Sequence, residues 1–525
     1  MRCISTSGGD TLITFSNVSL IYPNSTKTIL EDLSFEIVEG EFVLVIGSTG
    51  SGKSSLLRLI NGLVPHHTGG ILAGDIHVDG LSTQLVKPGG LAHLIGIVGQ
   101  NPANGFVADT VEEELVFGME ALNTPPEVMR KRVEEILDLL SLTPLRNRQI
   151  TTLSGGEQQR LAIGTALVMH PKVLVLDEPT SALDPIAAEE VLSILHRLVH
   201  DLSLTVVIAE HRLERVIGFV DRILEISGQG VARIEVPEII LKDSKIAPPI
   251  VHLARGLALP EVGLSVREVR RMTEELRGSD GSEGTGRSER KVIASSTPLF
   301  GVSDLHISYG DFPALKGVSV NVYPGQVLCV MGRNGAGKSS LLRALFEKAK
   351  CGYVPQEPGD LLYHQSVAAE CAQSDRDNKL AKGTTYSLLS KLLSSISPDV
   401  HPRDLSEGQR LALALSIVLA SNPQALILDE PTRGLDYQAK AVLINILKSY
   451  SQELEKPIIL ATHDVELVAE VADRVLFLAD GEVVADGPVL DVLLSSPAFA
   501  PQIAKVMSPK PWLTVSDVMN AVSSQ

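Results

Sequence analysis

Two glycine-rich stretches decide the fold: EFVLVIGSTGSGKSSLLRLI at residues 41–60 and QVLCVMGRNGAGKSSLLRALF at residues 326–346. Each is an apolar run that ends in glycines and continues into a helix-favouring segment, which predicts the order strand, loop, helix. Both fit the pattern Gly-x-x-x-x-Gly-Lys-Ser, in which backbone N–H groups surround a phosphate, the Lys reaches further phosphates and the Ser hydroxyl binds Mg²⁺. The predicted phosphate-binding residues are Gly47, Ser48, Thr49, Gly50, Ser51, Gly52, Lys53, Ser54 and Ser55 in the first loop, and Gly332, Arg333, Asn334, Gly335, Ala336, Gly337, Lys338, Ser339 and Ser340 in the second.

The sequence around the two loops is duplicated as well. LSGGE at 153–157 recurs as LSEGQ at 405–409, and VLVLDEPT at 173–180 recurs as ALILDEPT at 425–432, both with an offset of 252 residues. The lysines of the two loops are 285 residues apart, so the second copy has lost 33 residues, and 29 of them precede Gln356. We expect this loss to shorten the arm of strands beside the second loop.

The pattern of apolar runs predicts an α/β fold twice over, because each copy alternates short buried strands with amphipathic helices. Val133, Ile136, Leu137 and Leu140 follow helical spacing, as do Leu389, Leu392, Leu393 and Ile396, which predicts a helical subdomain ahead of each LSxG motif. The repeat continues into a short C-terminal extension of each copy. We therefore predict a first domain with its extension at 12–269, a flexible Gly- and Ser-rich linker at 270–297, and a second domain with its extension at 298–525.

Composition narrows the class of protein. The chain has 525 residues, 44% of them hydrophobic, and a net charge of −17, which argues against disorder and against binding nucleic acid through bulk positive charge. Its longest apolar stretch, 411–420, is too short for a membrane span of about 20 residues, and MRCISTSGGD lacks a signal-peptide pattern. We expect a cytoplasmic protein that does not bind nucleic acid.

Paired acids end two of the predicted buried strands, Asp177-Glu178 in the first copy and Asp429-Glu430 in the second. The carboxyl ends of parallel strands are where α/β sheets carry ligand chemistry, so the Asp is expected to hold Mg²⁺ through water and the Glu to act as general base. A solvated loop or a helix N-cap is the alternative for such a pair taken alone. Ser54 and Ser339 join the two Asp residues as predicted metal ligands.

With these motifs in place, the chain resembles the ATP-binding cassette (ABC) ATPases, on LSGGE and LSEGQ as much as on the two loops. The resemblance covers about residues 12–230 and 298–490 and implies ATP hydrolysis with ATP and Mg²⁺ as cofactors. It implies that Tyr22 and Tyr309 stack on adenine, that Gln100 and Gln356 sense Mg²⁺ and complete the set of predicted metal ligands, that His211 and His463 contact the γ-phosphate, and that Asp184 and Asp436 are loop acids that cross to the other cassette.

In this family, ATP is closed between two cassettes, so each site borrows the LSxG loop of the other copy. The resemblance therefore implies one site with Lys53, Gln100, Glu178, His211, Ser406 and Gly408, and another with Lys338, Gln356, Glu430, His463, Ser154, Gly155 and Gly156. One chain supplies both sites, so no homodimer is required. Because Glu407 replaces a glycine of the second LSxG loop, we predict that the Lys338 site carries more of the turnover.

The segment GQNPANGFVADTVEEELVFGMEAL at 99–122 is similar to the ATPases of energy-coupling factor (ECF) and cobalt-type importers. That resemblance implies a fused two-cassette subunit on the inner face of the cell membrane. Its partners would be integral membrane subunits, a T-type coupling protein and an S-type substrate-binding protein, and it would drive uptake of a vitamin or metal ion. The alternative is a soluble tandem-ABC translation or ribosome-associated ATPase, which the near-neutral segment 230–297 disfavours because such proteins carry a basic arm between their cassettes.

Overall fold

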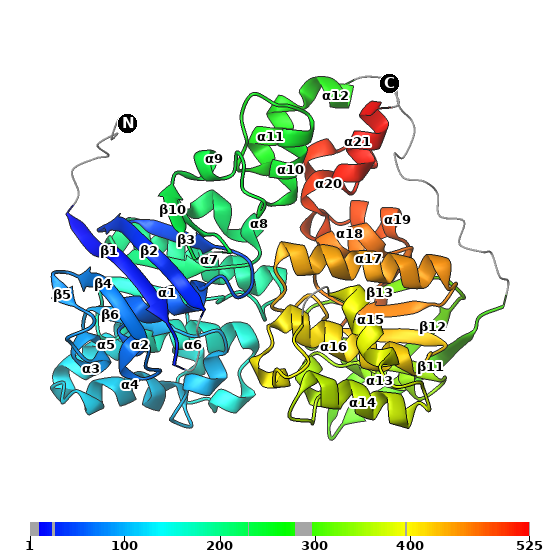
Figure 1. Cartoon of the computed structure of the whole chain (residues 1–525), viewed down its shortest axis with the longest axis horizontal. Helices are drawn as coiled ribbons and strands as arrows, with labels where there is room; N and C mark the ends of the chain where they lie inside the picture. Colours follow the sequence, from blue (N-terminus) through cyan, green and yellow to red (C-terminus); the bar gives the residue numbers. More distant parts are fainter. Residues whose placement is uncertain (1–9, 24–26, 229, 279–296, 394–395, 524–525) are drawn as a thin grey trace. The chain divides into compact units, whose positions relative to one another are not determined.

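The computed structural model describes residues 10–23, 27–228, 230–278, 297–393 and 396–523. The chain forms two compact units, Met1–Pro248 and Pro249–Gln525. Each unit contains a mostly parallel six-stranded sheet surrounded by helices (Figure 1). The predicted α/β class is therefore confirmed for both copies. Within the described ranges, no helix is both long enough and apolar enough to span a membrane.

The strands within the described part of the first unit form two sheets. They are β1 (Thr11–Ile21), β2 (Thr28–Val38), β3 (Phe42–Ile46), β4 (Ile71–Val78), β5 (Leu81–Ser82), β6 (Ile95–Val98), β7 (Val173–Asp177), β8 (Thr205–Ala209), β9 (Arg222–Ile226) and β10 (Ala232–Glu235). The main sheet has the order β10-β9-β3-β8-β7-β6, and only β10 is antiparallel to its neighbour. The second sheet, β2-β1-β4-β5, is antiparallel throughout.

The helices of the first unit connect these strands and cover the sheets. The α-helices are α1 (Lys53–Ile60), α2 (Leu63–His66), α3 (Pro88–Leu91), α4 (Val111–Ala121), α5 (Pro126–Leu139), α6 (Gly155–Leu167), α7 (Pro185–Leu202), α8 (Leu213–Val216) and α9 (Pro237–Ile240), and the 3-10 helices are η1 (Pro102–Gly105), η2 (Thr143–Leu145), η3 (Ile150–Thr152) and η4 (Ile217–Phe219). The predicted helical subdomain corresponds to α4 and α5. Val133, Ile136 and Leu137 of α5 are buried, as is Leu140 directly after it.

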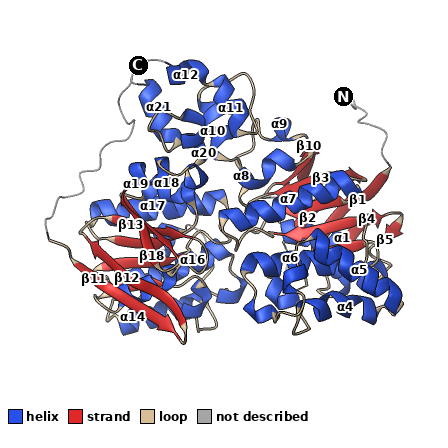
Figure 2. Cartoon of the chain, turned by 180° about the vertical axis from the view of Figure 1, so that it is seen from behind, coloured by secondary structure: helices blue, strands red, loops and turns tan. Residues whose placement is uncertain are grey.

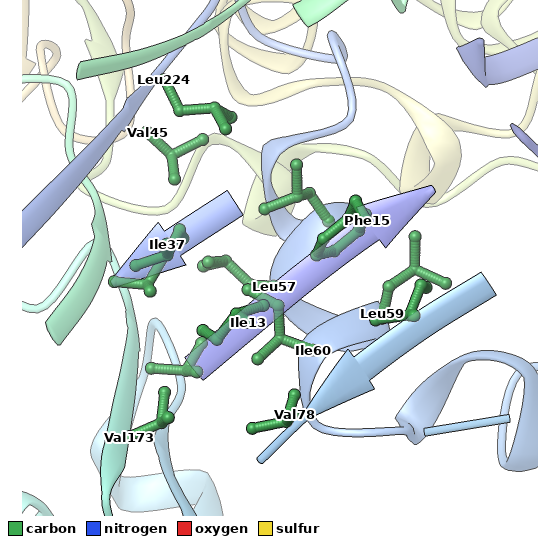
Figure 3. Packing of buried hydrophobic residues seen from close by; sticks show 14 of the residues in the cluster. Ile13, Phe15, Ile37, Val45, Leu57, Leu59, Ile60, Val78, Val173 and Leu224 are labelled. Carbon is green, nitrogen blue, oxygen red and sulfur yellow. The ribbon is translucent and has the colours of Figure 1, made fainter. Parts of the chain in front are cut away.

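One hydrophobic core joins the two sheets of the first unit through α1. Leu57, Leu59 and Ile60 of that helix pack between side chains of the antiparallel sheet, such as Ile13 and Phe15, and of the main sheet, such as Val45 and Val173 (Figure 3). The rings of Phe15 and Phe35 stack at 4.5 Å. Because α1 begins with the Lys of the phosphate-binding loop, this core fixes where that loop lies.

The second unit repeats the main sheet with fewer additions. Its strands are β11 (Phe300–Tyr309), β12 (Phe312–Val322), β13 (Val327–Gly332), β14 (Cys351–Val354), β15 (Ala425–Asp429), β16 (Ile458–Ala461), β17 (Arg474–Ala479) and β18 (Glu482–Pro488), and its main sheet has the order β14-β15-β16-β13-β17-β18. The other sheet holds only β11 and β12, against four strands in the first unit. The predicted shortening of this arm is confirmed, because the missing residues correspond to α2, β4, β5 and α3.

Helices complete the second unit. They are α10 (Pro249–Gly256), α11 (Val266–Met272), α12 (Glu274–Gly278), α13 (Lys338–Phe346), α14 (Val367–Asp377), α15 (Thr384–Leu392), α16 (Glu407–Ala420), α17 (Tyr437–Glu453), α18 (Val465–Val471), α19 (Val489–Leu494), α20 (Gln502–Met507) and α21 (Val515–Ser523), with 3-10 helices η5 (Pro358–Leu361), η6 (Pro402–Asp404) and η7 (Pro497–Phe499). In Figure 1 the helices α13, α16 and α17 surround the strands of this unit.

The extension of the first copy folds with the extension of the second. Helix α10 packs against α20 and α21, and α11 packs against α20, which Figure 2 shows as a group of helices. Arg270 of α11 donates to the backbone carbonyls of Lys505 and Val506 at 2.9 and 3.2 Å. The predicted domain boundary at 269 therefore differs from the boundary of the compact units at Pro248.

The predicted linker at 270–297 also begins too early. Helices α11 and α12 continue to Gly278, because Ser265 caps α11 and Val269 is buried within this helical group. The remaining linker prediction falls on 279–296, which lies outside the described residues.

Candidate nucleotide-binding sites

The two glycine loops close in the same way in both units. Lys53 Nζ donates to the carbonyls of Gly47 and Ser48 at 2.8 and 3.3 Å, and Lys338 Nζ donates to the carbonyls of Gly332 and Arg333 at 2.9 and 3.1 Å. Both ammonium groups are buried, and a buried charge is expected to have a counter-charge. The loops therefore present a fixed cation at the start of α1 and α13, where the helix N-terminus also favours an anion.

A glycine precedes each of these lysines for a backbone reason. Gly52 and Gly337 cap α1 and α13 with φ of 103° and 99°, in the left-handed region that L side chains rarely adopt. A Cβ at Gly52 would also lie 2.7 Å from the Leu30 side chain, and a Cβ at Gly337 would lie 2.5 Å from the Ala314 carbonyl. The loop geometry thus requires glycine at both positions.

The two predicted adenine-stacking tyrosines lie beside these loops. Tyr22 follows β1 and donates a hydrogen bond to Ser55 Oγ at 3.0 Å. Tyr309 ends β11, and its hydroxyl lies 3.4 Å from Ser340 Oγ. Tyr22 is half-buried, whereas the side chain of Tyr309 is 55% exposed. The second unit therefore offers a more open aromatic face next to its loop.

The remaining predicted residues of each site follow neighbouring parallel strands. In the first unit, Gln100, Glu178 and His211 follow β6, β7 and β8, which are adjacent in the sheet and are followed in order by β3 and its loop. In the second unit, Gln356, Glu430 and His463 follow β14, β15 and β16 in the same order. This is the edge of an α/β sheet where ligands bind.

In the first unit the structure brings three of these side chains into contact. Gln100 Nε2 donates to Glu178 Oε2 at 3.1 Å, and His211 Nε2 lies 2.8 Å from Glu178 Oε1. Burial acts to raise the pKa of the Glu178 carboxyl, but the hydrogen bond from His211 and the charges of His211 and Lys53 outweigh it, so the pKa lies below its ordinary value. Glu178 is therefore ionised at neutral pH, as a general base requires.

The second unit arranges the same residue types differently. His463 approaches Glu430 Oε2 through ring Nδ1 at 2.9 Å and through its backbone N–H at 3.3 Å. Lys338 Nζ lies 3.7 Å from Glu430 Oε1, and Gln356 is exposed beyond the end of β14, as Gln100 is beyond the end of β6. The two sites are thus not copies of each other in side-chain geometry.

Both glutamates have an unusual backbone conformation. Glu178 and Glu430 adopt φ of 50° and 48°, the left-handed region that favours glycine. Their N–H groups donate to the carbonyls of Ala209 and Ala461 at 2.9 and 2.8 Å, so the neighbouring strand holds them in place. Strained backbone of this kind persists where the surrounding structure over-determines it, as at functional sites.

The aspartates that end β7 and β15 have the chemistry of a metal-binding position. Burial raises the pKa of Asp177 and of Asp429, and hydrogen bonds from Ser54 and Ser339 oppose the shift. Asp429 Oδ1 is buried and has no hydrogen-bond partner among the described residues, so it is available to a ligand or to a metal-bound water. One carboxylate with one hydroxyl fits Mg²⁺, which takes few protein ligands besides phosphate oxygens and water. No group of three or more His, Cys, Asp or Glu side chains that could hold a metal ion occurs within the described ranges.

The LSxG motifs are helix N-termini with complete capping boxes. Ser154 caps α6, accepting from Glu157 N at 3.4 Å while Glu157 accepts from Ser154 N at 2.6 Å, and Ser406 caps α16 with Gln409 in the same way. Gly155 is exposed at the start of α6. A Cβ on Gly156 or Gly408 would lie 3.0 Å from the Cβ of Ala187 or Ala439 on the next long helix, so these glycines permit close packing.

Several residues in or near the two sites have contacts that the sequence motifs do not predict. Asp184 and Asp436, the predicted crossing acids, are buried N-caps of α7 and α17. Glu210 is buried beside His211, and Glu114 is buried at the start of α4, and sequence reasoning assigned no role to either. The sequence does contain an indication for Glu210, because an acidic residue directly after a buried apolar strand needs hydrogen-bond or charge partners.

Proteins of similar sequence are named as ATP-binding proteins. A family model described as ABC transporter matches residues 30–181 and 315–433. A protein of Streptomyces coelicolor, provisionally named an ABC transporter ATP-binding protein, is 48% identical over 98% of this chain and 100% of its own length. A similarly named protein of Methanosarcina mazei is 34% identical over 93% of this chain and 90% of its own.

Among solved structures, cbiO1 of Clostridium perfringens, described as part of the ABC transporter complex cbiONQ, is 28% identical over 48% of this chain and 96% of its own length, with a TM-score of 0.42. The two matched segments and the full-length relatives establish that the chain belongs to the ABC transporter family, as an ATP-binding protein that hydrolyses ATP and carries two cassettes.

Proposed function

We propose that the chain is the energy-coupling ATPase of an ECF or cobalt-type importer and that it drives uptake of a small solute, a vitamin or a metal ion, through separate integral membrane subunits. The T-type coupling protein and the S-type substrate-binding protein are the partners, and the chain lies on the inner face of the cell membrane. The support is the segment 99–122, which joins the first site directly to an exposed surface.

That segment is held at both ends. Gln100 bonds Glu178 in the site, and Asn101 begins η1 by accepting from Ala103 N at 3.2 Å. At the other end, the buried Glu114 accepts from the N–H groups of Val107 and Ala108, both at 2.8 Å. The Val107 side chain between these anchors is 65% exposed. A change at Glu178 that reaches Gln100 is therefore transmitted to an exposed apolar position.

In each site, side chains of this chain bind ATP and activate the attacking water. Lys53 and Lys338 hold the β- and γ-phosphates, and Tyr22 and Tyr309 stack on adenine. Mg²⁺, when bound with ATP, neutralises phosphate charge, and Ser54, Gln100 and Asp177, with Ser339, Gln356 and Asp429 in the second site, would hold it in part through water. Glu178 and Glu430 accept a proton from the attacking water, while His211 and His463 orient them.

The test is capture of membrane partners by the tagged full chain from detergent-extracted membranes, compared with Val107→Asp. A charge at this exposed apolar position should prevent docking and leave ATP affinity unchanged. Val231→Asp places the same charge at another exposed valine of the first unit and should change neither result. Equal capture of integral membrane proteins by Val107→Asp, or recovery of the chain with ribosomes and never with membranes, would refute the proposal.

A further inference from the structure

A buried carboxylate lies immediately before the histidine of the first site. Glu210 is 2% exposed, and its Oε1 accepts from the backbone N–H of Thr180 at 2.8 Å. Its Oε2 accepts from the backbone N–H of His211 at 3.3 Å. One side chain therefore ties the loop after Glu178 to the loop that carries His211.

Arg215 also forms hydrogen bonds to the loop that follows Glu178. Its Nη1 donates to the carbonyl of Thr180 at 3.3 Å and to the carbonyl of Leu183 at 3.5 Å. Both polar groups of the Thr180 backbone are thus bonded to side chains that come from the end of β8 and from α8. Because Thr180 is two residues after Glu178, this arrangement limits how far Glu178 can move.

The second unit lacks this arrangement at the same positions. With the offset of 252 residues, Glu210 corresponds to Thr462 and Arg215 to Leu467. There the backbone N–H of His463 donates to Glu430 Oε2 at 3.3 Å, so the glutamate of the site itself accepts this bond. In the first unit, Glu210 accepts the equivalent N–H, and Glu178 is bonded by the side chains of Gln100 and His211 instead.

We propose that Glu210 is a positioning residue of the first ATP site. Glu210 accepts hydrogen bonds from the backbone N–H groups of Thr180 and His211, so the His211 N–H does not bond to Glu178. Both carboxylate oxygens of Glu178 can then contact the side chains of Gln100 and His211. A carboxylate that accepts fewer backbone hydrogen bonds is a better proton acceptor. The inference rests on the proposed role of Glu178 as general base and adds a residue that acts on this site alone.

The experiment measures kcat and KM for ATP in Glu210→Thr, which installs the residue of the second unit, and in Glu210→Gln, which keeps the shape of the side chain and one acceptor. Each is made in the otherwise unchanged chain and in Glu430→Gln, where the general base of the first site alone is left. We expect Glu210→Thr to lower the kcat of the first site by about tenfold to a hundredfold, because misplacement of a catalytic group by about 1 Å costs about a hundredfold.

KM should stay within about twofold, because the phosphate-binding loop has other supports, and Glu210→Gln should recover part of the loss. Glu214→Gln removes a carboxylate from the neighbouring helix α8 and should leave kcat unchanged. Should Glu210→Thr fail to fold, Glu210→Gln carries the comparison.

Unchanged kcat in both backgrounds, or a rise in KM that matches the fall in kcat, would overturn the inference. If Glu178→Gln itself turned over normally, the base assignment would fail instead, so the two failures are distinguishable.

Discussion

At the scale of single residues, the burial of Asp429 makes the stability of the protein depend on pH. Burial raises the pKa of its carboxyl, and its Oδ1 is buried with no hydrogen-bond partner among the described residues. Because the folded protein holds this proton more tightly than the unfolded chain does, the free energy of unfolding falls as pH rises from the ordinary value of 3.8 through the raised value and stays lower above it. Without Mg²⁺ the ionised carboxylate is a cost to folding.

We therefore predict that Asp429→Asn stabilises the nucleotide-free protein at neutral pH by about 1 kcal/mol, because a buried charge without a full set of partners is removed. The same change should abolish the additional stabilisation by Mg²⁺ with ATP. Thermal unfolding with and without Mg²⁺ and ATP measures both effects, and Asp360→Asn, at an exposed position of η5, is the control. A less stable Asp429→Asn that Mg²⁺ and ATP still stabilised would contradict the assignment.

At this scale the sequence predicts the residues that follow a motif and misses those that depend on packing. The Lys, Ser, Asp and Glu of each site lie where the two glycine loops and the Asp-Glu pairs place them. The bonds of Glu210 to Thr180 and His211 could not be predicted, because they join two loops 30 residues apart. Nor could the hydrogen bond from Gln100 to Glu178, because it depends on how two loops 78 residues apart pack together.

At the scale of elements, a buried glutamate organises the start of the helical subdomain in both units. Glu114 on α4 accepts from the N–H groups of Val107 and Ala108, and Glu370 on α14 accepts from His364 N. Each helix thereby fixes the loop that precedes it. The helical spacing predicted these subdomains, but α15 ends at Leu392 because Leu393 is already extended, with φ of −143°.

Removing this anchor should loosen the loop without harming the ATP site. We predict that Glu114→Ala leaves the N–H groups of Val107 and Ala108 unpaired, at a cost of about 1–3 kcal/mol, and speeds their exchange with solvent. Hydrogen exchange by mass spectrometry over 101–109 measures this, alongside KM for ATP, which should not change. Glu113→Ala removes only the capping-box partner of Thr110 and serves as the control. Equal exchange in Glu114→Ala and the unchanged protein would show that the carboxylate does not hold the loop.

At the scale of the whole molecule, the duplication and the loss of 33 residues predicted two α/β units and the shorter arm of the second. What the repeat could not predict is that the extension of the first copy folds with the second unit, because only packing shows which surface covers α10 and α11. The two sites also differ in ways that their shared motifs conceal, in the contacts of Glu178 and Glu430 and in the residues around the two LSxG loops.

The unequal turnover of the two sites stays a prediction, and the structure alters its basis. Glu407, in place of a glycine, was expected to repel the nucleotide, but its carboxylate accepts from Arg410 at 2.6 Å, which reduces the repulsion. We predict that Glu430→Gln lowers ATP turnover more than Glu178→Gln does, and that Arg410→Gln, which removes this partner of Glu407, increases the difference. Steady-state ATPase rates of the single variants decide this, and equal losses would contradict the ordering.

ATP hydrolysis by this chain is predicted to depend on Glu178 and Glu430 as its two general bases. The measurement is the steady-state ATPase rate and the ATP affinity of the double variant Glu178→Gln/Glu430→Gln. We predict that turnover falls by about 10²- to 10⁴-fold, the contribution of a general base, while ATP still binds through Lys53 and Lys338. Turnover at the rate of the unchanged protein would show that Glu178 and Glu430 are not the general bases.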